Sequence, residues 1–165
     1  MPNVRPFLML AALAATTLAM PPARAETDTA DMAVSAEVVT GCTVTANPMR
    51  FGSLFGVTGS ARMSAAIHLR CSPNTAYGVE MDYGQNRQGN NRRMHNPVGN
   101  RYLRYRIFAD AAYSQQWDDR PRRQVSGNTG PTGMATLTAY GEIPSVTNLA
   151  ASGTYSDTVV VTVQF

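Results

Sequence analysis

Cysteine and histidine are the residues of this sequence best suited to metal binding or nucleophilic chemistry. The chain has two of each: Cys42 and Cys71, His68 and His95. A structural zinc site needs four well-placed ligands, and neither histidine lies at a metal-ligand spacing from a cysteine. An even number of cysteines is typical of disulfides in an exported protein. The sequence therefore predicts a Cys42–Cys71 bridge and no metal site.

Adjacent carboxylates are the second candidate for chemistry, because a pair of acids can serve as general acid and base. Asp118 and Asp119 are neighbours, but successive side chains diverge in direction, and Arg120, Arg122 and Arg123 follow at once to neutralise them. This arrangement favours a charged turn. No nucleophile, base and orienting group emerge together, so we expect no catalytic residues, no cofactor and no enzyme.

The first 25 residues have the features of a secretory leader. Arg5 precedes an apolar run over residues 7–20, and Ala23-Arg24-Ala25 places small residues where signal peptidase cleaves. The run is short for a membrane span. We therefore expect an exported protein whose mature chain begins near Glu26.

Size and charge limit what the mature chain can be. Without residues 1–25, the 165-residue sequence is long enough for one domain with its own core but not for two. All fourteen cations are arginine, and Arg5 and Arg24 leave with the leader, so the net charge falls from +3 to about +1. Such a balance does not call for nucleic acid as a partner.

Short runs of alternating apolar and polar residues, separated by turn signals, make up most of the mature chain. No segment shows a sustained apolar period of 3.6 residues, so the class is all-β. Strands of this number and spacing predict a two-sheet, antiparallel, immunoglobulin-like sandwich. His68 is expected on the solvent face of its strand. The expected strands are residues 42–46, 65–71, 76–83, 101–109, 134–143 and 155–165, with a bend or bulge in 49–55 and turns at 126–133 and 148–153.

Residues 84–100 are polar and rich in glycine and asparagine, which indicates a long loop or a loosely made hairpin. Four arginines, Arg87, Arg92, Arg93 and Arg101, make this region basic. Scattered arginines on a polar loop are usually solvated, and no aromatic residues alternate with them to stack on bases.

Residues 31–40, DMAVSAEVVT, read as a strand with no hairpin partner next to it in sequence. In an extended chain Met32, Val34, Ala36 and Val38 share one face, and Val39 lies on the other. Such a strand must pair with something distant, and the partner can belong to another molecule.

Several short motifs resemble those of the spore coat protein U domain family. The resemblance covers essentially the whole mature chain, and its most specific segments are Tyr140-Gly141-Glu142-Ile143-Pro144 and the run from Gly153 to Val163, GTYSDTVVVTV. The other matching positions are Cys42-Thr43-Val44, Ala46, Phe51-Gly52, Cys71, Tyr77-Gly78-Val79, Gly84, Asn86, Arg93-Met94 and Leu103-Arg104-Tyr105.

The family resembles pilin subunits of the archaic chaperone/usher pathway. This resemblance implies an incomplete sandwich over residues 41–165, completed by the N-terminal extension (residues 26–40) of the next subunit. The donor residues would be Met32, Val34, Ala36 and Val38, and the strand bordering the acceptor groove would carry Val159, Val161, Val163 and Phe165. Implied partners are neighbouring subunits in a head-to-tail polymer, a periplasmic chaperone and an outer-membrane usher. The implied location is the periplasm in transit and then a surface fibre for attachment and biofilm.

Two other functions stay open from the sequence. The chain could be a self-contained secreted sandwich that binds carbohydrate or a receptor through Tyr102, Trp117 and the arginine-rich loops, or a component of a spore or cell coat. The register of the donor strand and the place of the subunit in a fibre also stay open.

Overall fold

The computed structural model describes residues 27–54, 59–144 and 152–165. The expected leader, residues 1–25, and most of the expected turn at 148–153 lie outside them. Every regular element in the described part is a strand, and no helix there is long and apolar enough to cross a membrane. The strands are β1 (Cys42–Ala46), β2 (Ala61–Cys71), β3 (Ala76–Met81), β4 (Arg92–Asn96), β5 (Arg101–Phe108), β6 (Val125–Asn128), β7 (Met134–Ile143) and β8 (Val161–Gln164).

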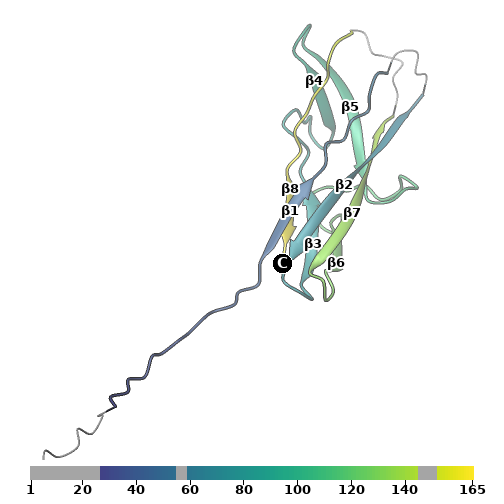
Figure 1. Ribbon diagram of the computed structural model, residues 1–165. Helices are drawn as coiled ribbons and strands as arrows, with labels where there is room; N and C mark the ends of the chain where they lie inside the picture. Colours follow the sequence, from purple (N-terminus) through teal and green to yellow (C-terminus); the bar gives the residue numbers. More distant parts are fainter. Residues whose placement is uncertain (1–26, 55–58, 145–151) are drawn as a thin grey trace, which may run out of the picture. The chain divides into compact units, whose positions relative to one another are not determined.

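The chain separates into two units, Met1–Glu37 and Val38–Phe165. In the first unit, residues 27–37 are extended, exposed and without secondary structure. The second unit holds all eight strands in two sheets (Figure 1). One has the order β1-β2-β7-β5-β4 and the other the order β6-β3-β8, and all paired neighbours are antiparallel. The predicted all-β, immunoglobulin-like sandwich is thereby confirmed.

The core lies between the sheets and is built from the faces that the alternation predicts. Tyr77, Val79 and Met81 of β3 are buried, as are Leu103 and Ile107 of β5. Alternate residues of a strand point to opposite faces, so each of these runs gives one row to the core and the other to solvent.

Residues 126–133 differ from the sequence prediction: they are not purely a turn, because β6 occupies Val125–Asn128 and pairs with β3. Of the two alternatives left open for residues 84–100, the hairpin is present from Arg92 onward, where β4 pairs with β5. The expectation that Arg92 is solvated is wrong, since its side chain is almost fully buried.

Arg92 can be buried because main-chain carbonyls accept the hydrogen bonds that its guanidinium would otherwise donate to water. Its Nε donates to Asp82 O at 2.9 Å, Nη1 to Trp117 O at 2.9 Å and Nη2 to Met81 O at 3.0 Å. Burial lowers the pKa of Arg92 from its ordinary value. The guanidinium thus fastens β4 to the end of β3 and to the segment that carries Trp117.

Replacing Arg92 with Met should lower the free energy of unfolding by about 2–4 kcal/mol, because two buried carbonyls and one half-buried carbonyl lose a charged donor. Urea denaturation measures this. Arg101→Met is the control, since Arg101 is exposed at the start of β5 and its loss should change stability little. Equal effects of the two substitutions would contradict the role given to Arg92.

The disulfide joins Cys42 and Cys71 across the β1–β2 pair, as the sequence predicts. The two cysteines are 29 positions apart. They are also direct register partners at the end of the ladder, so the bridge anchors β1 to β2.

We expect Cys42→Ser to lower thermal stability and accumulation of the exported protein, because opening a loop of this length costs roughly 3 kcal/mol. Thermal unfolding under oxidising conditions and the yield of exported protein measure the effect. A variant as stable and as abundant as the parent chain would overturn this expectation.

Candidate functional site

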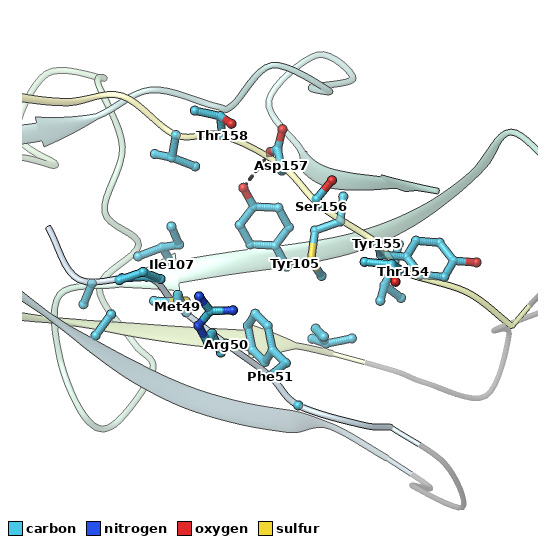
Figure 2. A pocket seen from close by; sticks show the side chains of 18 of the residues that line it. Met49, Arg50, Phe51, Tyr105, Ile107, Thr154, Tyr155, Ser156, Asp157 and Thr158 are labelled. Carbon is cyan, nitrogen blue, oxygen red and sulfur yellow. Dashed lines mark hydrogen bonds between the residues drawn. The ribbon is translucent and has the colours of Figure 1, made fainter. Parts of the chain in front are cut away.

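A long groove opens between the two sheets, with a volume of about 1620 Å³. One wall is residues 46–54, which begin at the last residue of β1, and the other is residues 152–159, which lead into β8. Figure 2 shows Met49 and Phe51 on the first wall facing residues 154–158 on the second, with Tyr105 and Ile107 between them. The floor is apolar and comes from both sheets: Ile67, Met81, Leu103, Ile107, Ala139 and Ile143.

The second wall is a strand edge with one side bonded. Ser156 exchanges backbone hydrogen bonds with His95 of β4, at 2.8 and 3.1 Å, and the carbonyls of Thr158 and Val160 accept from Gln85 N and Asp82 N. Backbone groups alternate in direction along an extended chain. Those of Asp157 and Val159 therefore point the other way, toward the groove.

β8 continues the groove-facing side of Asp157 and Val159, and we call this side of these two residues and of β8 the free edge. β8 pairs with β3 on one side and is the last strand of its sheet, so its other side has no ladder partner among the described residues. In Figure 1, β8 runs beside β1, but no ladder joins the two strands in the described part. An edge of unpaired N–H and C=O groups above an apolar floor is a template for an added strand.

The first wall fits closely against the sheet because of Gly141. A Cβ at this position of β7 would lie 2.1 Å from Met49 Sδ and 2.9 Å from Phe51 Cζ. Only glycine therefore lets these side chains lie flat on β7. The sequence indicated a bend near residues 49–55 but did not indicate this wall.

The groove contains part of the predicted bordering strand. Val159 and Val161 line it, whereas Val163 packs against the core outside the lining residues and Phe165 is 60% exposed. The expected strand 155–165 is a ladder only over Val161–Gln164, although the inward row predicted from its alternation is present.

The predicted donor residues lie in an exposed, extended segment. Met32, Val34 and Val38 are 86%, 87% and 94% exposed, and Ala36 is exposed as well. Residues 27–40 form no strand. Four apolar side chains on one face of an unpaired segment are in an unfavourable position in water.

The residues considered for other chemistry have structural partners. Trp117 is fully buried and donates from Nε1 to Val79 O at 2.8 Å, so the idea that it contacts a ligand is wrong. Tyr102 stacks on His95 and lies under the Arg93 guanidinium. His68 is exposed beside Thr136. Within the described ranges, no group of three or more possible metal ligands occurs.

Asp118 is held by arginines, as the charged-turn interpretation predicts. Its carboxylate is buried and pairs with Arg120 at 2.9 Å and Arg123 at 3.1 Å, and it accepts from Tyr83 Oη at 2.8 Å. Burial alone would raise the pKa of Asp118, but the hydrogen bonds from Arg120 and Tyr83 outweigh it and lower the pKa to about 2. This carboxylate is therefore a structural anion.

This pKa predicts acid sensitivity. A carboxyl group whose pKa is lowered on folding contributes stability above its unfolded pKa of about 3.8, and this contribution is lost as the pH falls toward 2. The full contribution is about 2 kcal/mol. Asp118→Asn should have a lower free energy of unfolding than the parent chain at pH 7. The difference between the two should shrink between roughly pH 4 and pH 2, the range set by the unfolded and folded pKa values of Asp118. Urea denaturation at several pH values measures it, and a constant difference would contradict this account.

An immunoglobulin-like sandwich with a groove along an unpaired strand edge defines the class of the molecule, and comparison with known proteins gives the family. The sequence profile of the Spore Coat Protein U domain matches residues 28–162, and the chain belongs to this family. The family is one of structural subunits, not of enzymes.

The known proteins that are similar to the chain include the following two. Protein U of Myxococcus xanthus is 29% identical over 176 residues, which cover 92% of this chain and 93% of that protein. The second is a chain from the crystal structure of the CsuC–CsuE chaperone–tip adhesion subunit pre-assembly complex, from the archaic chaperone–usher Csu pili of Acinetobacter baumannii. It matches with a TM-score of 0.56 and 27% identity over 78% of this chain, which spans 40% of the length of that chain.

Proposed function

We propose that this protein is a subunit of a surface fibre assembled by a chaperone and an usher, and that subunits join when the N-terminal extension of one enters the groove of the next. The observation that carries the proposal is the groove itself, with its free strand edge and apolar floor. An added strand would pair with that edge and cover the floor with its alternate side chains.

The extension has the pattern that such a groove needs. Met32, Val34, Ala36 and Val38 share one face, and three of them are at least 86% exposed. Burying them could contribute on the order of 5–10 kcal/mol before ordering costs are subtracted. Main-chain hydrogen bonds would add to this. Since donor and groove are different parts of the chain, the contact is head-to-tail and propagates a filament.

The remaining steps follow from the exposed apolar surface. An open groove would promote aggregation before assembly, so a periplasmic chaperone strand would cover it, next to Val159 and Val161. The chaperone–subunit complex in the related Csu structure supports this partner. Cleavage after residue 25 would free the extension, and an outer-membrane usher would pass the subunits to the surface. Attachment and biofilm formation are the functions we propose for the fibre.

A single substitution on the inserting face should block assembly. Val34→Asp would place a charge against the apolar floor, a cost that insertion cannot offset. Val39→Asp is the matched control, because Val39 lies on the opposite face of the extended segment. We expect a ladder of polymers in unheated gel samples of the parent chain and of the control, which collapses to monomer on boiling, and monomer alone for Val34→Asp.

The chain is expressed with and without a chaperone and usher of this class, and unheated and boiled samples are compared on the gel. A parent chain that stays a folded monomer without a chaperone would overturn the proposal and favour a self-contained binding domain. A ladder from Val34→Asp equal to that of Val39→Asp would show that the inserting face is assigned wrongly.

A further inference from the structure

A polar contact joins the floor of the groove to its free edge. Tyr105 of β5 donates from Oη to Asp157 Oδ2 at 2.6 Å, and Figure 2 shows this bond between the floor and the edge segment. The other carboxylate oxygen, Oδ1, accepts from the backbone N and the Nδ2 of Asn86 at 3.1 and 3.0 Å. We call Tyr105, Asp157 and Asn86 the clasp.

Burial, together with the hydrogen bond to Asp157, raises the pKa of Tyr105. The phenol therefore keeps its proton and remains a donor at neutral pH. Its bond with the carboxylate is of the charge-assisted kind, which is stronger than a bond between neutral groups.

Gly84 leaves the space that the carboxylate occupies. A Cβ at Gly84 would lie 2.1 Å from Asp157 Oδ2, and the residue has a φ of +77°, which disfavours any other side chain. Gly84, Asn86, Tyr105 and Asp157 all belong to the motifs that resemble the family, and the fold brings them to one point.

The position of Asp157 is unusual for a carboxylate. It belongs to an inward row in which Tyr155, Val159 and Val161 are partly buried and pack against the core. A valine here would add apolar burial, whereas a carboxylate loses hydration and needs compensating partners. Its own backbone groups face the groove, so the clasp acts on the stretch of edge to which an added strand would bond.

We propose that the clasp positions the free edge for strand insertion by holding it at a fixed distance from the floor. This role rests on the proposed function. Without the Tyr105 hydroxyl, the edge segment would leave its insertion-ready position for part of the time while the domain stays folded. A ligand that binds only one conformation has its affinity reduced by the fraction of molecules in that conformation.

The test uses the full chain carrying Val34→Asp and a fluorescent peptide of residues 27–40 with the native sequence. The substitution keeps the extension of the chain from competing with the peptide for the groove. Tyr105→Phe in this background should weaken peptide binding about tenfold, since a lost bond to a charged acceptor can account for such a factor. Fluorescence anisotropy measures the affinity. Amides of residues 154–160 should also exchange faster with solvent in the peptide-free variant.

Tyr83→Phe is the matched control. Tyr83 is also buried and also donates to a buried carboxylate, Asp118, at 2.8 Å, but it is not among the residues that line the groove. Its loss should lower the unfolding midpoint and leave peptide affinity unchanged. Tyr105→Phe is expected to lower the midpoint as well, because it also removes a bond to a carboxylate, but it alone should weaken peptide binding, which a purely stabilising hydrogen bond would not do.

The outcomes separate the two proposals. If the peptide fails to bind the chain with Tyr105 intact, the proposed function fails. There is then no strand insertion for which the clasp could position the free edge. If the peptide binds and Tyr105→Phe leaves affinity unchanged, the clasp role alone is wrong. If Tyr83→Phe weakens binding as much as Tyr105→Phe, general loosening of the fold is the cause and the positioning role is overturned.

Discussion

The free edge, the groove-facing side of Asp157, Val159 and β8 that has no ladder partner among the described residues, is the constraint around which the domain is built. Both sheets contribute apolar side chains to the space beneath it, so the floor is an unfinished part of the core and not a surface cleft. A finished sandwich would cover this space with one more strand. Here β1 and β8 are the sheet edges that border it, and no ladder joins them in the described part of the chain.

A domain with one open side needs strong attachments elsewhere, and the polar groups supply them. Arg92 binds carbonyls of β3 and of the Trp117 segment, and Trp117 Nε1 returns a hydrogen bond to Val79 O. Asp118, next to Trp117 in sequence, is saturated by Tyr83 and two arginines. These contacts join β3, β4 and the segment around Trp117, so this part of the sandwich does not depend on the missing strand. The Cys42–Cys71 disulfide likewise attaches β1 to β2.

The sequence predicts the rows of the core better than the polar attachments. Alternation alone places Val79 and Ile107 inside, because a period of two depends only on local backbone geometry. It left β4 open between a loop and a hairpin, since Arg92 breaks the expected pattern and its carbonyl partners come from residues that are distant in sequence. The groove is likewise predictable only in part. Alternation predicts the row through Val159 and Val161, but the wall at residues 46–54 is fixed by contacts with Gly141 that no local pattern contains.

The motifs that mark the family describe the groove more than the core. Gly141 of the YGEIP segment makes room for one wall, and Asp157 of the GTYSDTV segment binds the floor from the other wall. Gly84 and Asn86, which looked like ordinary loop residues, complete the site around that carboxylate. A core of this kind can be built from many apolar combinations of suitable volume. A groove with a fixed width and a free edge permits fewer combinations of residues. A glycine or a buried carboxylate at one position must match particular atoms at another. Short motifs therefore identify this family from sequence, while its strands follow the general pattern of any sandwich.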